Sequence, residues 1–184
     1  MKILGLACSP RRGGNTEILV EEALIAAREK GAQTEFLRVA DKQISPCDAC
    51  GACAGDGVCV IEDDMQKIYQ QLEMADGIIF GTPVYFINAS AQAKTIMDRS
   101  FAFYRTGKLR GKVAAAAVAV RRVGAGQVLS LLSSWFTAQR MITVGGCIGY
   151  GLEKGEVREG TGGGPGSGAQ RLARPSPSER PWSV

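Results

Sequence analysis

Short apolar runs alternate with amphipathic stretches along most of the chain. Apolar runs typical of buried strands lie at residues 2–8, 77–81, 112–120 and 141–148, and an alternating run at residues 33–39 predicts a further strand. Apolar positions at helical spacing lie between them, at residues 17–30, 65–74, 89–104 and 127–139. Strands that alternate with helices predict a parallel sheet with right-handed crossovers and a helical layer on each face. We therefore expect an α/β fold with three layers.

The composition indicates one globular domain whose chemistry comes from cofactors. The chain has 184 residues, a net charge of +4 that no run concentrates, and no histidine. A basic stripe with interleaved aromatic residues would predict nucleic-acid binding, and the sequence contains none. The longest apolar run, at residues 113–120, is too short to span a membrane, so we expect a cytoplasmic protein without membrane or nucleic-acid partners. Without histidine, Ser-His-Asp and Cys-His catalysis are excluded, and we expect no catalytic side chain.

Residues 9–16 lie between the first predicted strand and the first predicted helix. The run is rich in glycine and in polar residues that can donate hydrogen bonds. Backbone N–H groups at a helix N-terminus, together with the helix dipole, favour binding of a phosphate. The run matches neither the Walker A pattern nor G-x-G-x-x-G. A plain helix start capped by Asn15 or Thr16 would explain it as well, so by itself it favours phosphate binding only slightly.

Four of the six cysteines lie in one loop after the second predicted strand, with the spacing C-x2-C-x2-C-x5-C. They are Cys47, Cys50, Cys53 and Cys59. Small residues between them allow the backbone to wrap around one [4Fe–4S] cluster, which needs four thiolates. A zinc site usually pairs two separate C-x-x-C knuckles across a longer spacer. Disulfides would require an oxidising compartment, and the N-terminus has no secretory pattern. Unrelated surface thiols are the third alternative. We favour the cluster.

Two more loops follow predicted strands. Residues 82–90 contain Tyr85 and Phe86, which could cover a flat ring, and residues 121–127 contain glycines that allow close approach to a ligand. Open α/β sheets bind ligands at the carboxyl ends of their strands. A packed loop with core aromatic residues is the alternative for residues 82–90. Because three candidate loops lie at strand carboxyl ends, each supports the others.

Together these motifs resemble the iron–sulfur flavoprotein branch of the flavodoxin-like NAD(P)H-dependent FMN reductase family. The resemblance covers residues 2–151 and rests on residues 9–16, the cysteine loop, residues 82–85 and residues 124–127. It implies a doubly wound five-stranded parallel sheet of order 2-1-3-4-5, with the cysteine-rich loop inserted after strand 2 and FMN bound between strands 1 and 3.

The resemblance also implies the cofactor-binding residues. Cys47, Cys50, Cys53 and Cys59 would ligate the [4Fe–4S] cluster. Residues 9–16 would bind the FMN phosphate, and residues 83–86 would contact the isoalloxazine ring. The full set of expected FMN-binding residues is Ser9, Arg11, Gly14, Asn15, Thr16, Thr82, Pro83, Val84, Tyr85, Phe86, Asn88, Gly124 and Gly126.

The function implied is electron transfer. A one-electron carrier such as ferredoxin would supply the cluster, and electrons would pass through FMN to a small acceptor. One alternative is a cluster-free reductase of FMN or quinones with NAD(P)H as its partner. Another is a non-catalytic sensor module that binds flavin or metal. The resemblance implies a homo-oligomer, a dimer or tetramer, in which a cluster can face a neighbouring subunit's flavin.

We expect residues 1–154 to form the FMN-binding domain, with the iron–sulfur loop at residues 44–63. Residues 155–184 are rich in Gly, Pro and Ser, and the run 161–168 cannot hold a helix. The sequence therefore predicts a disordered or loosely attached tail in place of the family's last helix. A late change of reading frame is our hypothesis for this departure.

Overall fold

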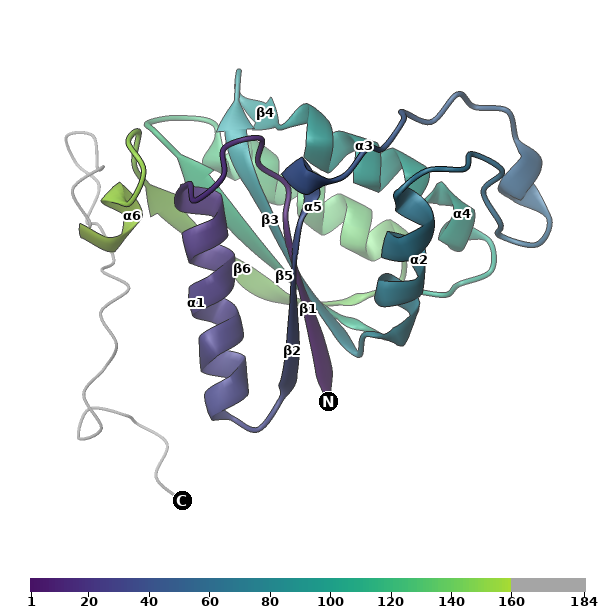
Figure 1. Cartoon of the computed structure of the whole chain (residues 1–184), viewed down its shortest axis with the longest axis horizontal. Helices are drawn as coiled ribbons and strands as arrows, with labels where there is room; N and C mark the ends of the chain where they lie inside the picture. Colours follow the sequence, from purple (N-terminus) through teal and green to yellow (C-terminus); the bar gives the residue numbers. More distant parts are fainter. Residues whose placement is uncertain (160–184) are drawn as a thin grey trace.

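A parallel five-stranded sheet forms the centre of the computed structural model, which describes residues 1–159 (Figure 1). The strand order is β2-β1-β3-β5-β6, so the predicted order 2-1-3-4-5 is confirmed. The strands are β1 (Lys2–Ala7), β2 (Gln33–Arg38), β3 (Gly77–Tyr85), β5 (Val113–Val120) and β6 (Ile142–Tyr150). Because all pairings among these strands are parallel, their carboxyl ends meet at one edge.

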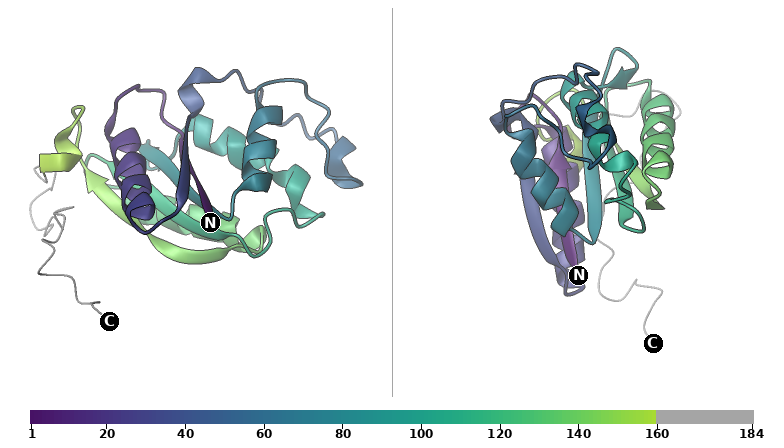
Figure 2. Two further views of the ribbon diagram at one scale, coloured as in Figure 1. Left: turned by 60° about the horizontal axis from the view of Figure 1, so that its bottom comes forward. Right: turned by 90° about the vertical axis from the view of Figure 1, so that its right-hand side faces the viewer.

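Helices cover both faces of the sheet, as the alternating pattern predicts (Figure 2). One face carries α1 (Asn15–Glu29) and the short α6 (Glu156–Glu159). The other carries α2 (Met65–Met74), α3 (Ala91–Arg99), α4 (Phe101–Tyr104) and α5 (Ala125–Ala138). Two short 3₁₀ turns, η1 (Val39–Asp41) and η2 (Ala52–Ala54), lie in the connection between β2 and α2. None of the helices within residues 1–159 is long and apolar enough to cross a membrane.

Each face of the sheet has its own apolar core. Leu4, Leu6 and Phe80 point to the larger core, where the Phe80 ring meets Trp135 of α5 edge-on with centroids 4.8 Å apart. Ile3, which precedes Leu4 and points to the opposite face, packs with α1 in the smaller core. This alternation follows from the two-residue period of a strand. It explains why β1, β3 and β5 are mostly apolar, since both of their faces are buried.

The structure differs from the sequence expectation at two boundaries. Strand β3 continues to Tyr85 and pairs with β4 (Asn88–Ala89) in an antiparallel hairpin, whereas we expected the strand to end at Gly81. The predicted helix at residues 89–104 is divided at Ser100 into α3 and α4. The hairpin extends β3 past the carboxyl end of the parallel sheet, so residues 84–87 lie above the carboxyl ends of the strands.

The packed chain also extends beyond residue 154, where we expected the domain to end. Val157 of α6 is buried against the smaller core, and α6 contacts α1. The remainder of the predicted tail, residues 160–184, lies outside the described residues. On β6, the side chains of Ile142 and Val144 are 55% and 63% exposed, so part of this strand is not covered by any described helix.

Candidate functional site

A small pocket lies at the carboxyl ends of the strands, where the predicted phosphate loop meets the β3–β4 hairpin. Its volume is about 100 Å³, which suits a phosphate-sized group, because pockets for whole drug-sized ligands exceed ~300 Å³. Eight of the residues expected to bind FMN line it: Ser9, Arg11, Gly14, Asn15, Thr16, Pro83, Val84 and Tyr85. The chain thus brings two segments about 70 residues apart in the sequence to one crevice at the switch point between β1 and β3.

The N-terminus of α1 is prepared for an anion. Gly14 is the N-cap of α1 and offers no side chain to the N–H groups of the first turn. These groups, beside Ser9 and Thr16 on the pocket wall, are available to a phosphate. The alternative in which Asn15 or Thr16 caps the helix is wrong, because both residues lie inside α1.

The ion pair between Glu17 and Arg38 supports the predicted phosphate loop, residues 9–16. Glu17 is 2% exposed and accepts hydrogen bonds from Arg38 Nε and Nη2, both at 2.8 Å. The same carboxylate accepts the N–H of Gly13 at 3.0 Å. Glu17 therefore joins the loop to β2, and the positive charge of Arg38 compensates a carboxylate that would otherwise be buried unpaired.

Two of the expected phosphate donors line the pocket and also brace a loop that the sequence analysis did not assign to the site. Arg11 Nη1 donates to the carbonyl of Leu152 at 3.0 Å. Asn15 donates from Nδ2 to the carbonyl of Glu153 and accepts the N–H of Gly155, both at 2.9 Å. These bonds hold residues 152–155 against the N-terminus of α1, so the loop after β6 forms one wall of the pocket.

Two basic residues on the pocket wall were missed at the sequence level. Arg121 follows β5 and Lys154 follows β6, and both line the pocket. They add positive charge opposite the helix N-terminus, which favours a phosphate group. The available signal was their position, since each basic residue comes shortly after the end of a predicted strand.

The hairpin between β3 and β4 presents apolar side chains above the pocket. Its turn residues Phe86 and Ile87 have positive φ angles of 47° and 65°, the backbone geometry of a tight two-residue hairpin. Tyr85 is 41% exposed and Phe86 is fully exposed. This is a surface on which a flat ring can lie, although Phe86 is not part of the pocket wall.

The remaining residues expected to bind FMN have other places in the structure. Thr82 is buried, and its Oγ1 accepts the N–H of Ser90 at 3.1 Å, which closes the base of the hairpin. Asn88 is exposed and accepts the N–H of Ala89. Gly124 has φ +101°, and a Cβ there would lie 2.7 Å from Val84 Cγ1, so only glycine allows this approach. Gly126 lies in α5 with open space around it.

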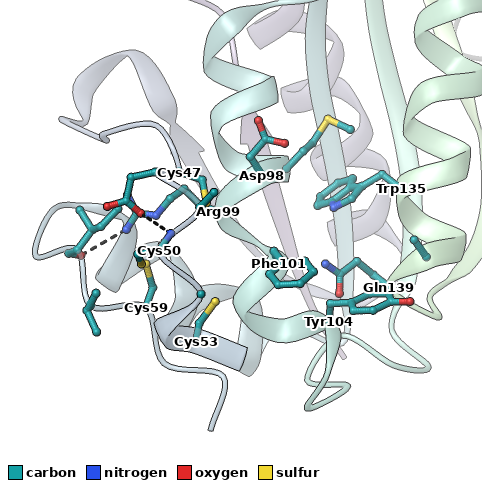
Figure 3. A pocket seen from close by; sticks show the side chains of 17 residues that line it. Cys47, Cys50, Cys53, Cys59, Asp98, Arg99, Phe101, Tyr104, Trp135 and Gln139 are labelled. Carbon is teal, nitrogen blue, oxygen red and sulfur yellow. Dashed lines mark hydrogen bonds between the residues drawn. The ribbon is translucent and has the colours of Figure 1, made fainter. Parts of the chain in front are cut away.

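The four loop cysteines line a second and larger cavity of about 740 Å³ (Figure 3). Its other wall comes from α3, α4 and α5 and includes Arg99, Phe101, Tyr104 and Trp135. All four cysteines are free thiols, which excludes the disulfide alternative in this structure. Cys47 and Cys50 are exposed, whereas Cys53 and Cys59 are half-buried.

All four thiols line one cavity, but they do not point to a common centre at metal-ligand distances. Within residues 1–159, no group of three or more Cys, Asp or Glu side chains has the geometry of a metal site. The thiols are nevertheless close enough to interact. Burial raises the pKa of Cys53, and negative charge on Cys59, Cys47 and Cys50 raises it further. A cationic core would relieve this repulsion, and four soft thiolates are the ligand set of an iron–sulfur cluster.

Two unsatisfied polar atoms support this cavity as a ligand site. In the part of the chain that the structure describes, the buried side-chain atoms without a hydrogen-bond partner are Arg99 Nε and Gln139 Oε1. Both residues line the cysteine cavity. Buried polar groups are nearly always paired, so such atoms point to a partner that binds there.

The two cavities occupy separate parts of the molecule. Among residues 1–159, none lines both of them. The cysteine loop extends from the end of the molecule that carries α4, away from α1 and the phosphate pocket (Figure 1). Within one chain, therefore, the cysteines do not adjoin the wall of the phosphate pocket.

Comparisons with known proteins identify the family of the chain. Residues 1–151 match the family described as NADPH-dependent FMN reductase. An iron–sulfur flavoprotein of Methanocaldococcus jannaschii is 44% identical over 147 residues, which are 79% of this chain and 76% of the relative. An iron–sulfur flavoprotein of Methanosarcina thermophila is 40% identical over 148 residues, covering 79% of this chain and 78% of the relative.

Solved structures share the fold at lower identity. The NAD(P)H:quinone oxidoreductase from Methanothermobacter marburgensis has a TM-score of 0.66 and 17% identity, over 84% of this chain and 89% of that one. The Trp repressor binding protein from Bacillus subtilis has a TM-score of 0.64 and 21% identity, over 85% of this chain and 92% of that one. The chain belongs to the NADPH-dependent FMN reductase family, in its iron–sulfur flavoprotein branch, and is an FMN-dependent oxidoreductase that performs flavin-based electron transfer.

Proposed function

We propose that this protein passes electrons from a one-electron carrier such as ferredoxin, through a [4Fe–4S] cluster and FMN, to a small acceptor. The observation that carries the proposal is the gathering of four cysteines around one cavity in a flavin-binding fold. Its relatives named above are iron–sulfur flavoproteins. When bound, FMN exchanges one or two electrons and the cluster exchanges one, so that together they link single-electron and two-electron chemistry.

The chain's own residues would bind and orient the two groups. The first turn of α1, with Ser9 and Thr16, would hold the FMN phosphate, and Arg121 and Lys154 would balance its charge. The hairpin around Tyr85 would support the isoalloxazine ring. Cys47, Cys50, Cys53 and Cys59 would provide the four thiolates. No side chain needs to act as a general acid or base.

We further propose that the active form is a homo-oligomer in which the cysteine loop of one subunit faces the flavin pocket of another. The separation of the two cavities within one chain supports this arrangement. Apolar side chains are exposed beside both cavities. Phe101 and Tyr104 stack with centroids 5.8 Å apart next to the cysteines, and Phe86 is exposed beside the flavin pocket. Association would bury these side chains.

The test is an absorbance spectrum with iron, sulfide and flavin analysis of anaerobically prepared protein. We expect about four irons per chain, one FMN, and bleaching of both cofactors when reduced ferredoxin is added. Serine variants of the four cysteines should lose iron and keep FMN. A yellow protein that contains FMN without iron after strictly anaerobic preparation would refute the proposal.

A cluster-free NAD(P)H-dependent reductase of FMN or quinones is the second candidate. The family description names NADPH, and the described cysteines do not converge as metal ligands. In this case the cysteines would be redox-active thiols. Steady oxidation of NAD(P)H with FMN or a quinone, in protein that contains no iron and without any carrier protein, would favour this candidate.

A further inference from the structure

Arg99, the last residue of α3, closes the neck of the cysteine loop. Its side chain has no exposed surface. Nη1 donates to the carbonyl of Ser45 at 2.8 Å, just before the first loop cysteine, and Nη2 donates to the carbonyl of Ile61 at 3.3 Å, just after the last one. A single guanidinium group therefore joins both ends of the loop.

Asp63 completes this closure. Its Oδ2 accepts Arg99 Nη1 at 2.7 Å and the N–H of Ser45 at 2.8 Å, and its Oδ1 accepts Arg99 Nη2 at 3.2 Å. The two Nη atoms of Arg99 are thus satisfied by the carboxylate and two carbonyls. The Nε–H group is left without a partner although it is buried, and a buried donor in that state is unfavourable.

The Arg99 side chain has both Tyr69 and the loop cysteines among its neighbours. Arg99 lines the cavity together with Cys47, Cys50, Cys53 and Cys59 (Figure 3). The positive charge of Arg99 also interacts with Cys59. The hydroxyl of Tyr69 donates to the Arg99 carbonyl at 2.6 Å and fixes the backbone from which the side chain extends. The unsatisfied donor therefore belongs to a residue that is rigidly held at the cysteine cavity.

We propose that Arg99 is a positioning residue for the iron–sulfur cluster, closing the cysteine loop through its Nη atoms and donating its Nε–H to a sulfur atom of the bound cluster or its ligands. This inference rests on the proposed function. Hydrogen bonds to cluster sulfurs and nearby positive charge stabilise the more negative, reduced state. Arg99 therefore raises the reduction potential of the cluster.

The test compares the cluster potentials of the anaerobic wild-type protein, Arg99→Lys and Arg105→Lys by EPR-monitored titration with dithionite. Lys keeps the charge and can still reach Asp63 but has no Nε–H. We expect Arg99→Lys to destabilise the reduced cluster about tenfold, which is a potential lower by ~59 mV for a one-electron couple. Arg105, an exposed residue just beyond α4, undergoes the same substitution and should leave the potential unchanged.

A second measurement does not depend on how well Arg99→Lys keeps its iron. Wild-type protein and Arg105→Lys are labelled with ¹⁵Nε-arginine, reduced, and examined by pulsed EPR. We expect a ¹⁵N coupling to the cluster in both proteins. Absence of this coupling would overturn the inference, as would an unchanged potential in Arg99→Lys that retains about four irons. Wild-type protein without iron would instead refute the proposed function, and the two failures are therefore distinguishable.

Discussion

The buried carboxylate of Glu17 gives the sharpest stability prediction. Glu17→Gln keeps the shape of the side chain but removes the negative charge that accepts two bonds from Arg38 and one from the N–H of Gly13. The amide retains one acceptor oxygen, so at least one charge-assisted bond is lost, at roughly 1.5–3 kcal/mol. Arg38 is 29% exposed and regains part of its hydration. We therefore expect a loss of about 2 kcal/mol in the free energy of unfolding.

The assay is urea unfolding of the FMN-free apoprotein near neutral pH, followed by circular dichroism. In thermal unfolding, the same loss of about 2 kcal/mol would lower the Tm by roughly 4–8 °C for a domain of this size. Glu22→Gln is the matched control, because Glu22 lies in the same helix and pairs with Arg158 at 3.6 Å at the surface. Surface pairs contribute about 0–1 kcal/mol. Equal effects of the two substitutions would refute the assignment of Glu17 as the support of the phosphate loop.

Three further predictions follow from the two sites. Lys154→Gln should weaken FMN binding about tenfold, or ~1.4 kcal/mol, while riboflavin, which has no phosphate, should bind equally to both proteins in a fluorescence titration; equal loss for both ligands would contradict the phosphate role. Gly124→Ala, with φ +101° and a Cβ 2.7 Å from Val84, should shift the hairpin and weaken FMN binding at least tenfold, whereas Gly126→Ala, in open space, should not. Burial opposes ionisation of Asp63, but bonds from Arg99 and from the N–H groups of Ser45 and Met65 lower its pKa. The ionised Asp63 carboxylate therefore stabilises the folded protein at pH values above the ordinary aspartate pKa of about 3.9. The difference in unfolding free energy between wild type and Asp63→Asn should therefore be full at pH 6 and disappear as the pH falls below about 3.9 and through the lowered pKa of Asp63. A pH-independent difference would contradict this prediction.

The sequence predicts the fold well because most of its local patterns are compatible with a single low-energy arrangement. Apolar strands such as residues 113–120 are buried on both faces, and only a parallel sheet between helical layers satisfies that. The hairpin was missed because the Phe86-Ile87 turn carries positive φ angles without a glycine or asparagine to signal them. Tertiary packing of β3 against β4 stabilises a backbone that local propensity disfavours.

The four cysteines and the polar loop after β1 were identifiable from spacing and position along the chain, because thiolate ligands and a helix N-terminus leave local signatures. Only the tertiary structure decided that Arg11 and Asn15 hold residues 152–155, that Lys154 and Arg121 face the phosphate pocket, and that Arg99 closes the cysteine loop. These contacts join segments far apart in the sequence. Their partners are determined by which strands and helices become neighbours, and a single sequence does not encode that proximity as a local pattern.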